Sequence, residues 1–204
     1  MGNEAEGRGM GQGVSRAGTI VKEGIIGSLR GIGEIEAEIV TLVRNTVSSV
    51  LQTTGFAATE SLTLVKDVVT GAIQATEEVG SGLVLSTKSV AKGVVMGASD
   101  VGGDLIAFAR QTVKTAVSSG NEIGADVGVV ASRAVNGVVE AAKEIGGNVG
   151  EITKAGVEGA LEAAGTIGNT AVQTVRDVLV GLAGGIKDVG SAILPKTERK
   201  EPKG

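Results

Sequence analysis

The chain has 204 residues, with 19 basic and 23 acidic side chains, a formal net charge of -4 and 34 glycines. It contains no His, Cys, Trp or Tyr, which excludes thiol nucleophiles, disulfides, thiolate zinc sites and imidazole acid–base catalysis. An acidic chain with only two aromatic residues also lacks the basic patches and stacking platforms that nucleic acids require, so we expect no nucleic-acid partner.

The first predicted element, residues 1–11, is a glycine-rich tail that we expect to be disordered. It has no apolar run of the kind found in secretory signal peptides, which favours a cytoplasmic protein or one peripheral to a membrane or inclusion. The last element, residues 195–204, holds both prolines and many charges, and we expect it to be disordered too. Between them, residues 12–194 lack proline and strand-type punctuation and are predicted to be helical.

A repeat of 22 residues organises the region from residue 12 to residue 187, which eight copies fill. One marker is an Ile or Val followed by Gly, and a second is a basic residue that returns in seven of eight repeats. The marker glycines are Gly80, Gly102, Gly124, Gly146, Gly168 and Gly190. The repeat bases are Lys22, Arg44, Lys66, Lys88, Arg110, Lys154 and Arg176.

The period predicts amphipathic helix, because 22 residues make six turns of about 3.67 residues, as in an eleven-residue helical repeat. In the window that starts at Asp100, one apolar stripe contains Val101, Leu105, Ile106, Ala109, Val113, Ala116 and Val117. The repeat base, Arg110 here, lies at the stripe edge, where its charge stays in water. The predicted fold class is all-α, with long amphipathic helices forming an extended rod, a hairpin stack or a bundle.

Glycine implies that the stripe is packed against something. Within residues 12–187 lie 28 of the 34 glycines, and each costs about 1 kcal/mol relative to Ala in a helix. The helices therefore need support from one another or from an apolar surface. We predict that the marker glycines lie in the stripe and permit close helix packing. The pairs Gly93/Gly97, Gly124/Gly128 and Gly146/Gly150 follow the small-xxx-small pattern of tightly packed helices.

No catalytic, metal-binding or cofactor-binding residue is predicted, and we expect the protein not to be an enzyme. Adjacent acids such as Glu77 and Glu78 do not face each other on a helix, and the Ser and Thr residues have no His base. The longest uncharged stretch, residues 45–59, has 15 residues and many Ser and Thr. It is too short and too polar to span a membrane, so we expect no transmembrane helix.

The repeat pattern resembles that of amphipathic-helix proteins of the synuclein type, with perilipins and exchangeable apolipoproteins more distant. The resemblance rests on Lys22-Glu23-Gly24-Ile25, on Lys154-Ala155-Gly156-Val157 and on the Val-, Ala-, Thr- and Gly-rich stretch from Val68 to Thr76. It covers the period and composition of residues 12–187 and implies a helical protein that lies on a lipid surface.

Two functions remain open at this point. The first is a non-catalytic coat on a membrane, lipid droplet or polyester inclusion, with the repeat bases contacting anionic groups. The second is a self-assembling α-helical scaffold, in which stripes of one chain or of several copies pack through their Gly and Val residues. The continuous stripe and the absence of marked turns favour the coat, whereas the strict period favours the scaffold. The mean hydropathy of +0.26 disfavours a third class, the hydrophilic protective proteins.

Overall fold

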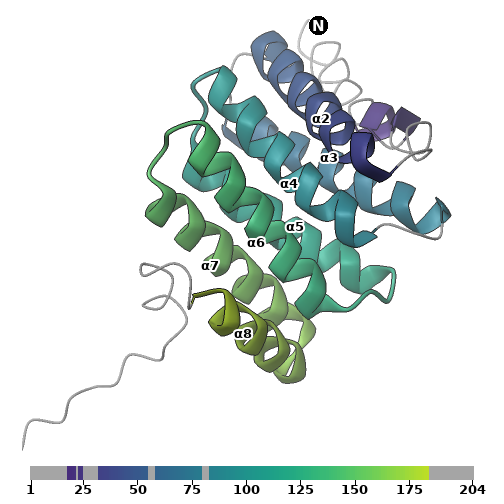
Figure 1. The fold of residues 1–204 in the computed structure, drawn as a ribbon, viewed down its shortest axis with the longest axis vertical. Helices are drawn as coiled ribbons and strands as arrows, with labels where there is room; N and C mark the ends of the chain where they lie inside the picture. Colours follow the sequence, from purple (N-terminus) through teal and green to yellow (C-terminus); the bar gives the residue numbers. More distant parts are fainter. Residues whose placement is uncertain (1–17, 22, 25–31, 55–57, 80–82, 184–204) are drawn as a thin grey trace, which may run out of the picture.

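The computed structural model describes residues 18–21, 23–24, 32–54, 58–79 and 83–183. Regular structure in these ranges is helical throughout, as the sequence predicts. The helices are α2 (Ile32–Thr54), α3 (Ala58–Val79), α4 (Leu83–Asp100), α5 (Leu105–Glu122), α6 (Val127–Glu144), α7 (Val149–Ile167) and α8 (Asn169–Ala183), after helical residues at 18–21 and 23–24 (Figure 1). The predicted tails, residues 1–11 and 195–204, lie outside the described residues.

The helices form two layers, which makes the protein a stack of helical hairpins rather than a rod. The most extensive contacts join helices two places apart in the chain: α2 with α4, α4 with α6, and α5 with α7. Helices α2, α4 and α6 therefore make one layer, and α3, α5 and α7 make the other, behind it in Figure 1. Contacts between successive helices, such as α5 with α6 and α6 with α7, join the two layers.

Each of α5 and α6 is a helix of 18 residues, followed by a turn of four residues, which together account for one repeat. Glycine follows the ends of α4, α5 and α6 at Gly102, Gly124 and Gly146, the turn glycines, whose φ angles are +75°, +75° and +68°. After α5, the Gly124 N–H donates to the carbonyl of Asn121 and the Ala125 N–H donates to the carbonyl of Gly120, at 3.0 and 2.8 Å. These two bonds form a Schellman motif, which favours glycine because of its positive φ.

The next helix begins two residues after each turn glycine, at a capping side chain. The capping residues are Asp104, Asp126 and Asn148. At the start of α6, the Asp126 carboxylate accepts hydrogen bonds from the N–H groups of Gly128 and Val129, at 2.9 and 3.0 Å. A left-handed glycine followed two residues later by a capping Asp or Asn therefore ends one helix and starts the next.

The marker glycines do not have the predicted role in close helix packing. A β-carbon added to Gly102, Gly124, Gly146 or Gly168 would meet nothing within 4 Å. The first three lie in turns, and Gly168 ends α7 with a φ of +143°. The prediction is wrong for these four because the chain reverses direction where a continuous helix would have kept them in the stripe. Gly80 and Gly190 lie outside the described residues.

Close packing is instead provided by a second glycine series, inside the helices. A β-carbon on Gly93 would lie 2.9 Å from the carbonyl oxygen of Val40, and one on Gly97 would lie 2.6 Å from that of Arg44. These contacts confirm the predicted Gly93/Gly97 pair. On Gly137 and Gly159 an added β-carbon would overlap the carbonyl oxygens of Lys88 and Arg110, respectively. We call Gly93, Gly97, Gly137 and Gly159 the crossing glycines, because each lies where two helices of one layer touch.

The predicted apolar stripe forms the core between the layers. From α2 to α8, the residue three places after each repeat base, or after Ser132 where α6 lacks one, is at most 2% exposed. These residues are Val47, Val69, Ala91, Val113, Val135, Val157 and Leu179. Most of the core consists of Val and Ala, whose small side chains suit the short separation that the crossing glycines allow.

Candidate functional site

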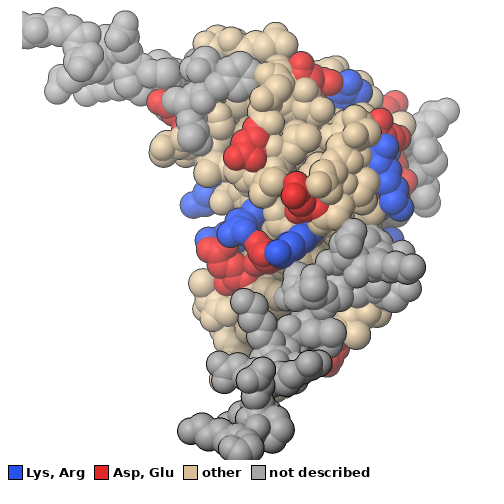
Figure 2. All heavy atoms as spheres, turned by 90° about the vertical axis from the view of Figure 1, so that its left-hand side faces the viewer, with Lys and Arg blue, Asp and Glu red and all other residues tan. Residues whose placement is uncertain are grey.

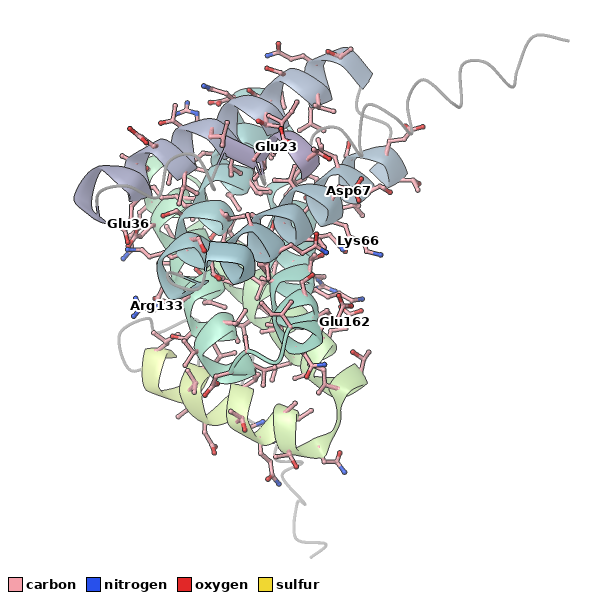
Figure 3. The ribbon with its side chains drawn as sticks, turned by 90° about the vertical axis from the view of Figure 1, so that its right-hand side faces the viewer. Glu23, Glu36, Lys66, Asp67, Arg133 and Glu162 are labelled. Carbon is pink, nitrogen blue, oxygen red and sulfur yellow. The ribbon has the colours of Figure 1, made fainter. Side chains whose placement is uncertain are left out.

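The repeat bases follow the two layers and do not form one edge. Arg44 and Lys88 lie on α2 and α4, whereas Lys66, Arg110 and Lys154 lie on α3, α5 and α7. Figure 3 shows the two faces, with Lys66 and Glu162 on one side of the molecule and Glu36 and Arg133 on the other. Arg176 is exposed on α8, and Lys22 lies outside the described residues.

On the face of α2, α4 and α6, a groove of about 420 Å³ is lined by three basic and three acidic side chains. They are Arg44, Lys88, Lys92, Glu36, Glu140 and Glu144. Lys88 pairs with Glu140 at 2.7 Å, and Lys92 pairs with Glu144 at 2.9 Å. Figure 2 shows basic and acidic side chains next to one another across a face of the molecule. Because the three basic and three acidic side chains balance, the net charge of the groove favours neither an anionic nor a cationic ligand.

At one end of this groove, Arg44 of α2 binds Asp100 of α4. Its Nε and Nη2 atoms donate to the two carboxylate oxygens, each at 2.6 Å, in a bidentate pair. The hydrogen bond to Asp100 raises the pKa of Arg44 above its ordinary value, although partial burial acts against this. The guanidinium therefore stays charged and ties the first helix of its layer to the second.

The face of α3, α5 and α7 also carries ion pairs between its helices, and its pair Lys114 with Glu162 repeats Lys92 with Glu140 one repeat later. Arg110 of α5 pairs with Glu158 of α7, and Lys114 pairs with Glu162 at 2.6 Å. On both faces, a base of one helix thus contacts an acid of the helix two places further along. Exposed pairs of this kind contribute about 0–1 kcal/mol each, so they fix the register of neighbouring helices more than they stabilise the fold.

The remaining described bases of the series form no ion pair with described residues. Lys66 lies on α3, and the positions of α5 that correspond to Glu140 of α6 and Glu158 of α7 carry Ser118 and Lys114. Lys154 and Arg176 lie on α7 and α8, and no described helix follows two places after either. The sequence correctly indicates that these positions are at the surface, but the acids that pair with the others were not predicted as partners.

Asp67 of α3 is a half-buried acid whose pKa is shifted by its surroundings. It lines a small hollow with Gly18, Lys66 and Gly71, where residues 18–21 cross α3. Burial raises the pKa of Asp67, and the charge of Lys66 lowers it by a smaller amount. The carboxylate therefore carries its charge at an energetic disadvantage in the folded protein.

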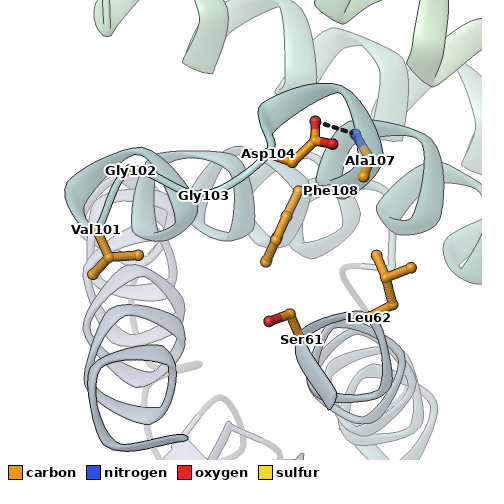
Figure 4. Close-up of a pocket in the computed structure, with 8 residues that line it drawn as sticks. All are labelled: Ser61, Leu62, Val101, Gly102, Gly103, Asp104, Ala107 and Phe108. Carbon is orange, nitrogen blue, oxygen red and sulfur yellow. Dashed lines mark hydrogen bonds between the residues drawn. The ribbon is translucent and has the colours of Figure 1, made fainter. Parts of the chain in front are cut away.

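A second hollow, of about 250 Å³, lies under the turn between α4 and α5 (Figure 4). Phe108 and Leu62 give it largely apolar walls, and the Asp104 carboxylate at its rim already accepts the N–H groups of Ile106 and Ala107. Elsewhere in the described part of the chain, the buried hydroxyls of Thr112 and Thr153 have no hydrogen-bond partner among the described residues. Among the described residues no group of three acidic side chains is arranged to hold a metal ion.

Comparison with known proteins supports the architecture. The chain is similar to the crystal structure of a de novo designed helical repeat protein, DHR7, with 19% sequence identity and a TM-score of 0.50. The likeness covers 90% of this chain and 96% of the designed one. At this identity it shows the fold alone. No protein-family model matches the chain, and no curated protein matches its sequence. No helix among the described residues is long and apolar enough to cross a membrane.

Proposed function

We propose that the protein is a non-catalytic structural scaffold, a helical repeat held together by its own Gly and Val residues. The observation that carries the proposal is the contact at the crossing glycines. At Gly137 and Gly159 the carbonyl oxygen of a neighbouring helix occupies the space of a β-carbon. Such contacts need one fixed helix pair in one fixed register, which protein packing supplies and fluid lipid does not.

Burial of the stripe supports the same proposal. Val113, Val135 and Val157 are at most 2% exposed, because helices of both layers cover them. The two faces that remain carry paired bases and acids, at Lys88 with Glu140 and elsewhere. A surface of this kind suits a rigid spacer or platform whose buried stripe holds its own shape.

The lipid-surface coat is a second proposal, and it is supported by the common register of all repeats and by the resemblance to synuclein-type proteins. A coat function requires the two layers to separate, since the stripe must reach the lipid. It also requires the ion pairs of Arg44, Lys88 and Arg110 to open so that these bases can contact anionic groups.

Circular dichroism and urea unfolding, with and without vesicles of anionic or neutral phospholipid, test the scaffold. We expect high helix content and cooperative unfolding in buffer, unchanged by either vesicle. Low helix content in buffer that rises sharply with anionic vesicles would overturn the scaffold in favour of the coat.

Two matched variants of α7 sharpen the test. Gly159→Leu places a side chain against the Arg110 carbonyl, whereas Gly165→Leu places it in open space on the same helix. The scaffold predicts that Gly159→Leu alone loses cooperative unfolding. Equal unfolding behaviour of the two variants in buffer would contradict the proposal.

A further inference from the structure

Each end of the stack exposes an apolar residue that the interior does not. At one end the equivalent interior residues are buried, and at the other end they are polar. Four large apolar side chains of the described residues are exposed: Ile20 at 53%, Ile106 at 43%, Val129 at 37% and Val180 at 49%. Ile106 and Val129 lie singly near helix starts. Ile20 and Val180 lie on the first and last described helical segments.

Ile20 occupies a core position of the repeat. The equivalent residue is at most 4% exposed in each of α3 to α7. These residues are Leu64, Ser86, Phe108, Val130 and Ile152. A preceding helix covers the position in the interior, as α5 does where Gly120 meets Val130. No described helix precedes Ile20, so the first segment presents an apolar residue that the interior of the stack would bury.

The other end shows a complementary departure on α8. Position 180 is polar in α3 to α7, where it carries Thr70, Lys92, Lys114, Asn136 and Glu158. In α8 it is Val180, half exposed. The last helix thus carries an exposed Val at a position that is polar inside the stack.

The forward face of α7 is also incomplete. Leu161 is half-buried, whereas its equivalents Val95, Val117 and Val139 are at most 5% exposed. Repeat proteins that remain monomeric usually close their ends with polar capping helices, and these positions do not follow that rule.

We infer that the stack continues from one copy to the next, head to tail, with residues 18–21 and α2 of a second copy placed after α7 and α8 of the first. We expect a second copy of this chain at the exposed ends, because neighbouring helices inside the stack already contact one another at the equivalent repeat positions. The proposed contact is therefore a continuation of the interface between α5 and α7. It rests on the scaffold proposal, which supplies a folded stack with two ends, and such a heterologous contact produces linear chains.

Sedimentation velocity of the full chain over a wide range of concentrations gives the direct test. We expect species that grow in steps of 20.2 kDa as the concentration rises. Folding is checked by circular dichroism in the same samples. A folded protein that stays monomeric at every concentration would overturn the inference and leave the scaffold intact. An unfolded protein would overturn both.

Variants at the two ends distinguish a head-to-tail contact from other kinds of association. Ile20→Glu and Val180→Glu should each weaken self-association about tenfold or more, whereas Ile106→Glu, at a comparably exposed residue inside the stack, should change it less than about twofold. An equal loss with Ile106→Glu would contradict the inference.

Mixing the two end variants tests whether the contact is head to tail. Each variant retains one intact end. At a concentration at which each variant alone is monomeric, an equimolar mixture of Ile20→Glu and Val180→Glu should therefore form a dimer and nothing larger. A mixture that remains monomeric, or one that forms chains as long as the wild type, would contradict a head-to-tail contact.

Discussion

At the crossing of α5 and α7, Gly159 lies against the carbonyl oxygen of Arg110, whereas in the turn between α5 and α6, Gly124 faces open space with a φ of +75°. The first position needs glycine because no β-carbon fits, and the second needs it because of the backbone angle. The two regions therefore respond differently to one added methyl group. That difference measures how much of the fold depends on packing and how much on local geometry.

The largest effect is expected at the crossing. Gly159→Ala should lower the free energy of unfolding by about 2–3 kcal/mol, because either α7 moves away from α5 or the core strains. Urea unfolding followed by circular dichroism measures it. Gly165→Ala, on the same helix but in open space, should instead raise stability by about 0.5–1 kcal/mol. A gain at both positions would show that the crossing does not restrict side-chain size.

In the turn, Gly124→Ala should cost about 1–2 kcal/mol, through the left-handed backbone angle and not through a clash. Gly124→Asn should cost less, because Asn tolerates this angle better than Ala does. The same denaturant titration checks both variants. If Asn and Ala cost the same, backbone geometry is not the reason for glycine here.

The capping residue beside that turn should contribute somewhat less. Asp126→Ala leaves two N–H groups of α6 without their acceptor and should cost about 1 kcal/mol. Asp126→Asn keeps an acceptor and should restore most of the loss. Thermal unfolding of the three proteins tests this, and no difference between Ala and Asn would exclude a capping role.

The ion pairs next to the crossing should contribute less again. A double-mutant cycle with Lys114→Ala and Glu162→Ala should give a coupling energy of about 0.2–1 kcal/mol, decreasing as salt is added. The measurement is the free energy of unfolding of all four proteins at low and high salt. A coupling above about 2 kcal/mol would mean that these pairs stabilise the layer as strongly as the crossing glycine.

The smallest effect concerns Asp67, at the crossing of α3 with residues 18–21. Burial raises the pKa of Asp67 in the folded state, so the folded protein holds this proton more tightly than the unfolded chain does. The resulting stability is present below the ordinary carboxyl pKa and is lost as the pH rises through the raised pKa. Asp67→Asn should therefore stabilise the protein by up to about 0.5 kcal/mol at neutral pH, and not in acid, in thermal unfolding at both pH values. A loss of stability at neutral pH would show that the charge is favourably paired.

The buried stripe could be predicted from the sequence, because the 22-residue period sets its position within every helix. Ala109, Val113 and Val117 are buried as predicted. Ile106, in the same predicted stripe, is 43% exposed. It lies in the first turn of α5, where the helix has just left the preceding turn and the neighbouring helices no longer cover that face.

The turns could not be predicted from the period, because 22 residues keep the stripe in phase whether the chain continues as one helix or reverses. The local signal was nevertheless in the sequence: Gly102, Gly124 and Gly146 are each followed two residues later by Asp or Asn, which marks a stop and a start. Interpreting these glycines as packing residues concealed that signal.

The crossing glycines also left a signal that the prediction missed. Gly93, Gly137 and Gly159 share one phase of the repeat with Gly71, where an added β-carbon would overlap the carbonyl oxygen of Gly18, and Thr115 interrupts the series. Gly97 lies outside this phase. Where Thr115 replaces glycine, α5 contacts α3 far less extensively than it contacts α7. The ion-pair partners could not be found in this way, because they depend on which helices become neighbours and not on any spacing within one helix.

The contacts made by Gly137 and Gly159 are displaced from each other by one helix, although they lie in different layers. The pairs Lys92 with Glu140 and Lys114 with Glu162 are displaced in the same way. Both layers therefore use one set of contacts, related by a screw operation that advances one helix at a time. In terms of molecular evolution, the gene could lengthen by duplicating a segment that encodes one helix and one turn. A repeat protein whose two layers differ must instead duplicate helices in pairs.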